Sequence, residues 1–219
     1  YKAERSALKF AESILFYSQH LKEWVYEYYS ENCFWGKVLV SPPPLKRLPL
    51  AKVERKFNQE ADRVLFFGYI NYLKGADTFI NAALLLLNHQ QSRHYKFVLV
   101  GGDFEGSIVE GYSSFTEYLQ ARIPSDLLDY FEFSGHLSHD QLTLLLPEVC
   151  FAVIPSHIES FGYAAHELYA QGVPLILRNI PAFLEYFTHE KNALIFDAEC
   201  RIELREIVLV RRVTRPITK

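Results

Sequence analysis

From residue 63 to residue 197, short apolar runs alternate with segments in which apolar residues recur at helical spacing. The apolar runs predict strands at 63–68, 95–102, 130–137, 150–156, 173–179 and 192–197. The segments between them predict helices at 75–91, 113–123, 125–130, 138–149, 162–172 and 180–187, with Asp77 and Ser138 near two helix starts. Because the strand runs are apolar throughout, helices are expected on both faces of the sheet. The pattern predicts an α/β, three-layer α/β/α domain with a mainly parallel sheet.

Residues 1–44 follow a separate pattern of helix, strand, helix, strand. Helical spacing occurs at 4–12 and 20–31, "SILFYS" at 13–18 has the composition of a short buried strand, and "KVLV" at 37–40 predicts a second strand. The prolines of "SPPP" then stop any regular element. Residues 45–62 are polar, mixed in charge and without a clear period, which indicates a linker. We expect a main domain at 63–200 and a helical segment at 201–219.

The composition is that of a folded protein able to bury a core: 219 residues, 49% hydrophobic, 22% charged, with a net charge of −3. The basic residues are scattered, so a nucleic-acid-binding surface is not indicated. A small basic group near the end predicts a solvated tail; it consists of Arg211, Arg212 and Arg215. No apolar run reaches the roughly 18–20 residues that span a bilayer, and the start does not resemble a signal peptide.

Three cysteines, Cys33, Cys150 and Cys200, lie far apart in the sequence. Their odd number and wide spacing fit neither a disulfide framework nor a metal-ligand pair, which favours a reducing, cytoplasmic location. The chain starts at Tyr1 and contains no methionine. We therefore expect it to be part of a longer polypeptide.

In an open parallel sheet, ligands bind at the carboxyl ends of the strands. Here those ends are "FFGY", "LVGGDF", "FSGHL", "IPSHIES" and "LRNIP", and most carry glycine or small polar residues. "GGDFEG" at 101–106 lacks the spacing of the dinucleotide fingerprint, and no glycine run ends in Lys-Ser or Lys-Thr as in a P-loop. Neither a nicotinamide or flavin site nor a P-loop is predicted.

Two residues at these strand ends have two interpretations each. Lys74 precedes Gly75 at a helix start, where it could meet a phosphate beside unpaired N–H groups or be a solvated surface lysine. His136 could stack on a base or be an ordinary turn histidine. The histidines show no zinc-type i, i+4 pair, so no metal site is predicted.

Glu159 and Glu167 flank a Ser-Phe-Gly turn and lie eight positions apart. An exposed loop and helix is one interpretation; two carboxylates directed into one hydroxyl-binding pocket is the other. An acid–base pair for glycoside hydrolysis fits less well, because carboxylates this close in sequence tend to lie side by side rather than across a sugar ring. Ser160 as a nucleophile is not favoured, since "ESFG" is not the G-x-S-x-G elbow.

The segment "PSHIESFGYAAHELYAQGVPLIL" at 155–177 resembles the signature of the retaining glycosyltransferases with the GT-B fold, specifically glycosyltransferase family 4. Glu159 and Glu167 match the family's E-x7-E motif, and Gly172 and Pro174 match the Gly-x-Pro that follows. "VLFFGYINYLKGADTFINAALLLL", "FVLVGGD" and "FSGHLS" resemble its other strand–loop segments. The resemblance covers about 63–198 and implies the Rossmann-like, donor-binding C-terminal half of a GT-B fold. Residues 1–44 resemble the closing segment of the N-terminal, acceptor domain.

The resemblance also implies roles for individual residues. Glu159 would contact hydroxyls of the transferred sugar, Glu167 would bind the ribose hydroxyls, and Lys74 would pair with the diphosphate; Glu159 and Lys74 are the expected catalytic residues. The remaining donor-binding residues are expected to be Gly68, Tyr69, Gly101, Gly102, His136 and, through backbone N–H groups, Ser160, Phe161 and Gly162. A lysine and a helix N-terminus suit the charge that develops on a departing diphosphate. A carboxylate can accept from both hydroxyls of a diol.

One position departs from the family pattern. An arginine usually follows the first loop glycine, and this chain has Tyr69 there. Tyrosine keeps a hydrogen-bond donor but lacks the fixed charge and the fork of arginine, so donor binding is expected to be weaker unless another cation substitutes. Arg178, at a neighbouring strand end, is a candidate replacement.

The resemblance implies a glycosyltransferase that moves a sugar from a nucleotide-diphosphate sugar to a hydroxyl of a glycan, lipid carrier or small molecule, with retention of configuration and without a metal or other cofactor. Activity would require the missing acceptor domain, since the reaction centre lies between the halves. Two alternatives are a GT-B sugar-nucleotide epimerase and a non-catalytic relative that binds nucleotide sugars. A cytoplasmic location is implied, and attachment at the inner membrane face is common in the family. Nothing in the sequence indicates the base, the sugar or the acceptor.

Overall fold

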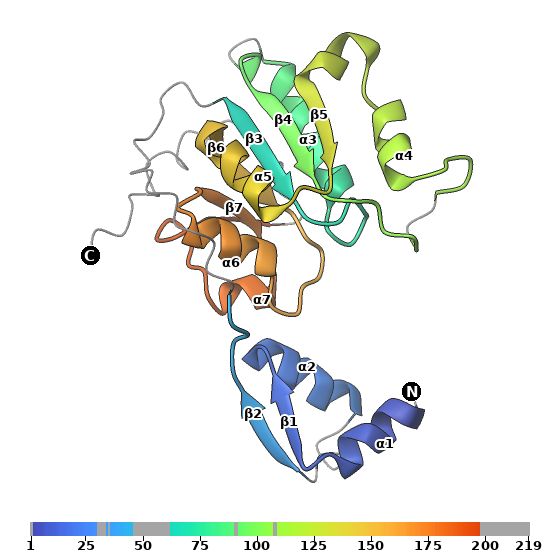
Figure 1. The fold of residues 1–219 in the computed structure, drawn as a ribbon, viewed down its shortest axis with the longest axis vertical. Coiled ribbons are helices and arrows are strands. Elements are labelled where there is room, and N and C mark those ends of the chain that lie inside the picture. The colour runs from blue at the N-terminus through green and yellow to red at the C-terminus, as the bar shows by residue number, and fades with distance from the viewer. Residues whose placement is uncertain are drawn as a thin grey trace.

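The computed structural model describes residues 2–29, 34, 36–45, 62–89, 92–106 and 109–197. The described residues up to 45 form a small N-terminal unit, and those from 62 onward form a larger unit (Figure 1). The predicted linker at 45–62 lies outside the described residues except for its two end positions, and the predicted helical segment at 201–219 lies wholly outside them. The domain boundaries drawn at these segments stay predictions.

The small N-terminal unit contains the four predicted elements in the predicted order: α1 Lys2–Phe10, β1 Ser13–Phe16, α2 Gln19–Tyr29 and β2 Lys37–Val40. The two strands pair in parallel, with Ser13 opposite Lys37. The expectation that β1 is a buried strand is wrong, because Leu15 is 54% exposed and Phe16 alone in the strand is buried. A sheet of two strands, which is all that the described residues supply here, cannot cover both of its faces.

The larger unit is built on a six-stranded parallel sheet in the order β5-β4-β3-β6-β7-β8. The bounds are β3 Arg63–Phe67, β4 Lys96–Val100, β5 Phe131–Gly135, β6 Val149–Ile154, β7 Leu175–Arg178 and β8 Leu194–Phe196. Every residue of β6 is buried, as are four of the five residues of β4. The prediction of a parallel sheet with both faces covered is therefore confirmed.

Helices cover both faces of this sheet (Figure 1). They are α3 Ala76–Leu87, α4 Phe115–Ala121, α5 His139–Leu145, α6 Tyr163–Ala170 and α7 Pro181–Leu184, with 3-10 turns at Ser125–Tyr130 and Leu146–Glu148. Successive side chains of a strand point to opposite faces, so Val64 and Phe66 pack in one core cluster with Phe79 of α3. Leu65 packs in the second cluster with Phe183 of α7. The two clusters make the predicted three layers.

Most of the predicted helices occur where the pattern placed them, but several are shorter: the one predicted at 138–149 is α5 followed by a 3-10 turn and ends before Val149, and the one predicted at 180–187 is only α7. Residues 125–130 form a 3-10 helix rather than an α-helix. The helix predicted at 75–91 ends at Leu87, where its apolar face ends and Asn88 forms the C-cap. The start signal at Ser138 is confirmed: its hydroxyl accepts from the Gln141 N–H while the Gln141 side chain accepts from the Ser138 N–H, a capping box.

The strand order reverses at β3. From β3 the chain moves outward through β4 and β5, then returns to the other side of β3 to add β6, β7 and β8. At such a switch point the loops after neighbouring strands diverge and leave a crevice at the carboxyl edge of the sheet. The loops after β3 and β6 therefore flank the place where an open α/β sheet binds its ligands.

Candidate functional site

Lys74 lies in the loop after β3, and a compact turn fixes its backbone. The Lys74 N–H donates to Asn71 Oδ1 at 2.8 Å, and the Asn71 carbonyl accepts from the Ala76 N–H at 3.2 Å. Asn71 is itself buried. An asparagine that bonds the backbone two or three positions on is a common turn device, so Asn71 holds Lys74 at the start of α3.

Gly75 brings this loop into contact with the loop after β6. Its φ of 72° lies in the left-handed region, and a Cβ at this position would lie 2.2 Å from the Pro155 carbonyl oxygen. Only glycine fits both conditions. The contact places the backbone beside Lys74 directly against the segment that leads to Glu159.

Lys74 and Glu159, which are 85 positions apart in sequence, form an ion pair. Lys74 Nζ donates to Glu159 Oε1 at 2.7 Å, and Ser156 Oγ donates to the same oxygen at 2.9 Å. The side chain of Glu159 is 10% exposed and that of Lys74 is 29% exposed. The pair is thus largely shielded from solvent, where its attraction is stronger than at a surface. The recorded bonds of Glu159 both end on Oε1, which leaves Oε2 as a further acceptor.

His157 fastens the two loops beside this pair. The backbone N–H of His157 donates to the Leu73 carbonyl at 2.8 Å, and the His157 ring stacks on the Tyr72 ring with centroids 4.5 Å apart. Arg178 Nη1 lies 3.3 Å from His157 Nε2. Burial and the nearby Arg178 charge lower the pKa of His157. Because arginine can only donate, the neutral ring accepts at Nε2.

The bend after Glu159 leads into α6. Gly162 forms the helix start with a φ of 82°, and its carbonyl accepts from the Ala165 and His166 N–H groups at 3.1 and 3.3 Å. In the described part of the chain, no acceptor is recorded for the N–H groups of Phe161, Gly162 and Tyr163. Unpaired N–H groups at a helix N-terminus attract anions.

Two aromatic rings, those of Phe161 and His166, stack on each other at the bend. The Phe161 ring stacks on the His166 ring, with centroids 4.1 Å apart and planes at 11°. His166 Nδ1 lies 3.0 Å from the Gly162 carbonyl oxygen, and its Nε2 is buried without a recorded partner among the described residues. Burial lowers the pKa of His166, against the opposing effect of the bond to Gly162. His166 is therefore a neutral ring that donates from Nδ1.

The glycine loops after β3, β4 and β5 lie side by side. The Gly68 N–H donates to the Val100 carbonyl at 3.0 Å, and the Gly101 N–H donates to the Gly135 carbonyl at 2.8 Å. The Gly102 carbonyl accepts from the Ile70 N–H at 2.9 Å. Gly68, Gly101 and Gly102 therefore share one edge, and the exposed His136 follows Gly135 at its end.

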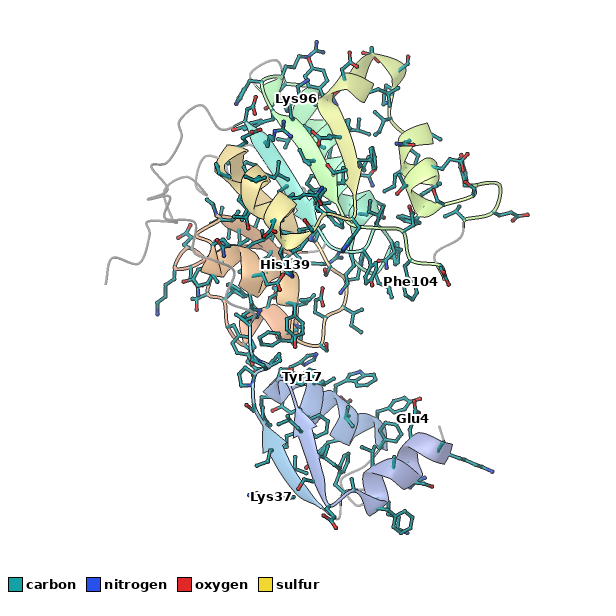
Figure 2. The ribbon with its side chains drawn as sticks, in the orientation of Figure 1. Glu4, Tyr17, Lys37, Lys96, Phe104 and His139 are labelled. Atoms are coloured by element: carbon teal, nitrogen blue, oxygen red, sulfur yellow. The ribbon has the colours of Figure 1, made fainter. Side chains whose placement is uncertain are left out.

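Tyr69 extends from this edge into solvent, with 56% of its surface exposed. Its ring meets that of Phe104 edge to face at 5.8 Å. Figure 2 shows Phe104 at the side of the larger unit, below α4 in this view. Two exposed aromatic rings thus lie over the loops after β3 and β4.

The structure brings the predicted site residues together in two groups. Lys74 and Glu159 form one group with the bend at Ser160, Phe161 and Gly162, and the glycine loops with Tyr69 and His136 form the other. Glu167 lies half-buried in the second turn of α6. Arg178, the candidate replacement for the arginine that Tyr69 displaces, contacts His157. The roles assigned to these residues stay predictions.

Sequence reasoning missed three residues that hold the site: Asn71, Ser156 and His157. Asn71 was detectable in principle, because an asparagine three positions before Lys74 and four before Gly75 is a turn signal. Ser156 and His157 carry no comparable signal, since their partners are far away in sequence or lie across a bend.

The described residues contain no cluster of three or more His, Cys, Asp or Glu side chains that could hold a metal ion. Nor does any helix within them combine the length and the apolar character needed to cross a membrane.

Residues 50–207 match the protein-family model described as Glycosyl transferases group 1. The match covers well over half of the chain, so the chain belongs to this family. A curated relative is the 2-deoxystreptamine N-acetyl-D-glucosaminyltransferase of Niallia circulans, which is 29% identical over 134 residues, or 61% of this chain and 32% of that protein. The chain spans half or less of the length of the curated relatives it matches.

Solved glycosyltransferase structures share the fold. The pneumococcal O-GlcNAc transferase GtfA in complex with UDP and GlcNAc aligns with a TM-score of 0.67 at 14% identity, over 98% of this chain and 40% of that chain. HepE of Anabaena in complex with UDP and glucose aligns with a TM-score of 0.67 at 16% identity, over 95% of this chain and 58% of that chain. The predicted Rossmann-like half of a GT-B fold is thereby confirmed.

Proposed function

We propose that this chain is mainly the donor-binding half of a retaining glycosyltransferase of family 4, which transfers a hexosyl-type sugar from a nucleotide-diphosphate sugar to a hydroxyl. Membership of the glycosyltransferase group 1 family supports the class of reaction. UDP in the GtfA and HepE structures makes UDP-sugars the first donors to test. The family 4 assignment rests on the E-x7-E spacing of Glu159 and Glu167.

The observation that carries the proposal is the Lys74–Glu159 pair. Its 2.7 Å contact joins the loops after β3 and β6 at the switch point of the sheet. A cation and a carboxylate side by side suit a ligand in which phosphate and sugar hydroxyls are adjacent, as they are in a nucleotide sugar. A structural ion pair would not need the unpaired N–H groups that follow it at the start of α6.

In the proposed complex, the donor diphosphate lies between Lys74 and the N–H groups of Phe161 and Gly162. Lys74 is 29% exposed, so its ammonium group can reach a phosphate oxygen while it stays near Glu159. Glu159 Oε2 accepts from hydroxyls of the transferred sugar. Each hydrogen bond to a charged group contributes roughly 1.5–3 kcal/mol. Glu167 binds the ribose hydroxyls, and the glycine loops with His136 border the base.

The reaction breaks the bond between C1 of the sugar and the diphosphate oxygen. The acceptor hydroxyl oxygen forms the new bond to C1 on the same face, and its proton passes to an oxygen of the leaving diphosphate. Negative charge accumulates on the diphosphate as the bond breaks, and Lys74 and the α6 N-terminus stabilise that charge where it develops. No side chain has to act as a nucleophile, and no metal or cofactor takes part in this scheme.

The acceptor, which is a glycan, a lipid carrier or a small molecule, would bind mainly through an N-terminal domain of which residues 1–44 are the last part. The reaction centre would then lie between the domains, so this chain alone binds donor without transferring sugar. We place the whole enzyme in the cytoplasm, attached at the inner membrane face where its acceptor is lipid-linked.

A binding titration tests the proposal. The chain is titrated calorimetrically with UDP-glucose, UDP-GlcNAc, ADP-glucose and GDP-mannose, and at least one is expected to bind. Glu167→Ala and Lys74→Met should each weaken that binding at least tenfold. The control is Arg122→Met, because Arg122 is an exposed residue at the C-cap of α4. This variant should bind like the parent chain. Absence of binding to every donor, or unchanged binding in both site variants, would refute the proposal.

A non-catalytic relative that binds nucleotide sugars is the second candidate, and Tyr69 favours it. Where the family pattern has arginine, the exposed Tyr69 supplies no fixed charge for the diphosphate. The same titration followed by an assay of the full-length protein separates the two candidates, because a non-catalytic relative binds donor without releasing nucleoside diphosphate in the presence of any acceptor.

A further inference from the structure

The start of α2 in the N-terminal unit is hydrogen-bonded to the larger unit at two places. Ser18 Oγ donates to the Ser160 carbonyl at 2.8 Å. The Gln19 and His20 N–H groups donate to the two carboxylate oxygens of Glu185 at 3.0 and 3.1 Å. Figure 1 shows α7, which ends beside Glu185, next to α2, and Figure 2 shows Tyr17 at the junction of the units. Ser18 thus meets the bend at Ser160, 142 positions later in the chain, while Gln19 and His20 meet the end of α7.

Ser18 makes two bonds with one hydroxyl. Its side chain is buried, and Oγ accepts from the Leu21 N–H at 3.0 Å, as an N-cap does. A serine hydroxyl has one proton to donate, and here that proton goes to Ser160. A cap alone would leave the proton free to rotate toward any acceptor. The Ser18 side chain therefore stabilises α2 and ties it to the bend.

The hydrogen bond from Ser18 to the Ser160 carbonyl, called the tie below, fixes the orientation of one peptide group in the candidate site. The peptide unit is planar and trans, so the Ser160 carbonyl and the Phe161 N–H point in opposite directions. With the carbonyl held toward Ser18, the Phe161 N–H points away from α2. This N–H is one of the groups without a recorded acceptor in the described part of the chain, and Glu159 directly precedes the same bend.

Glu185 keeps the start of α2 in the place that the tie requires. A carboxylate at a helix N-terminus is favourable both as a hydrogen-bond acceptor and through the helix dipole. Burial by itself would raise the pKa of Glu185, but the hydrogen bonds from Gln19 and His20, together with weaker contributions from Tyr186 and His20, lower it. The Tyr186 hydroxyl adds a contact to the Tyr17 carbonyl at 3.4 Å. The carboxylate is thus charged and bound to α2 at neutral pH.

We propose that Ser18 is a positioning residue for the donor site: through the Ser160 carbonyl it aims the Phe161 N–H at the diphosphate of a bound nucleotide sugar. The proposal rests on the proposed function and adds a residue of the N-terminal unit to a site otherwise built from the larger unit. It also makes donor affinity depend on the contact between the two units.

Three variants of the whole chain test this inference. Ser18→Ala removes the hydroxyl, and Ser18→Thr keeps it. Glu27→Gly is the matched control, because Glu27 is exposed in the same helix and a glycine there weakens α2 by about as much as the loss of a cap, without contact to the bend. Binding of UDP, ADP, GDP and TDP is measured by calorimetry, and thermal unfolding by circular dichroism.

For the nucleoside diphosphate that binds the parent chain most tightly, Ser18→Ala should raise Kd about three- to tenfold, which corresponds to the loss of one neutral hydrogen bond. Ser18→Thr and Glu27→Gly should bind within about twofold of the parent. Equal weakening in Ser18→Ala and Glu27→Gly would show that Ser18 acts only through the stability of α2 and would overturn the proposal, as would an unchanged Kd in Ser18→Ala.

Amide hydrogen exchange separates this inference from the proposed function. In the ligand-free chain, Ser18→Ala should speed exchange in a peptide covering residues 158–165 at least threefold relative to Glu27→Gly. If no diphosphate binds the parent chain, the proposed function fails and the donor role of Ser18 fails with it, whereas faster exchange would still show the tie. If a diphosphate binds and exchange in the bend is unchanged, the tie is absent and only the inference about Ser18 fails.

Discussion

The Lys74–Glu159 ion pair should show a strong asymmetry when its two members are removed separately. Lys74→Met leaves a carboxylate that is 10% exposed with Ser156 as its recorded neighbour. Glu159→Gln leaves an ammonium that is 29% exposed and can still be hydrated, while the glutamine amide oxygen can accept from Lys74 and Ser156. Removal of the lysine should therefore destabilise the chain more than removal of the carboxylate charge.

The magnitudes follow from the burial of the two groups. Breaking a fully buried pair costs about 3–5 kcal/mol, and exposed pairs are worth about 0.2–1 kcal/mol. The Lys74–Glu159 pair lies between these limits. We expect a loss of about 2 kcal/mol for Lys74→Met and about 1 kcal/mol for Glu159→Gln. In the double variant no unpaired carboxylate remains, so the loss of unfolding free energy should be no larger than in Lys74→Met. Compared with the sum of the two single losses, this gives a coupling energy of about 1 kcal/mol.

Urea unfolding of the whole chain, followed by far-UV circular dichroism at pH 7, measures these free energies. The control is the equivalent cycle with Arg63→Met and Glu148→Gln, because this pair has a similar N–O distance of 2.8 Å but a carboxylate that is 59% exposed. Its coupling should be about 0.5 kcal/mol or less. If the Lys74 and Glu159 losses add within about 0.3 kcal/mol, the ion pair does not exist in solution and the reasoning about the site is wrong.

Three further predictions concern other positions of the site. Gly75→Ala should lower the unfolding free energy by at least 2 kcal/mol in urea titrations, because the added Cβ would lie 2.2 Å from the Pro155 carbonyl oxygen at a φ of 72°. His166→Phe should reduce the loss of stability between pH 7 and pH 5: the half-buried ring has a lowered pKa, so as the pH falls below about 6.5 the unfolded chain binds a proton that the folded chain does not. Tyr69→Arg should tighten binding of the preferred nucleoside diphosphate about three- to tenfold in calorimetry, because it adds a fixed charge.

Each of these has its own control and contrary outcome. Gly102→Ala has open space for a Cβ, and equal losses at both glycines would contradict the steric argument for Gly75. His139→Phe makes the same exchange at an exposed histidine and is the control. A His166→Phe pH profile that matches the parent would show that partial burial does not hold the His166 ring neutral in solution. Unchanged affinity in Tyr69→Arg, with Tyr69→Phe as control, would place the diphosphate away from this position.

Much of the fold was predictable because its signals are local. The apolar runs at 63–68 and 150–156 can be buried on both faces only in a parallel sheet covered by helices, and the Ser138 cap marks a helix start from four residues. The same holds for part of the site: the E-x7-E spacing and the position of Lys74 at a strand–helix loop are visible in the sequence. The exposure of β1 was not predictable, because an apolar run does not indicate how many strands will lie beside it in the sheet.

The sequence by itself thus determined the strand–helix alternation, the class of fold and the candidate residues. Only the tertiary structure decided which side chains meet: Glu159 with Lys74 and Ser156, Arg178 with His157, and Ser18 with the Ser160 carbonyl. The physical reason is that hydrophobic period and capping depend on neighbours within a few residues. Contacts across 85 or 142 positions depend on the order in which the strands assemble and on the angle at which two units touch.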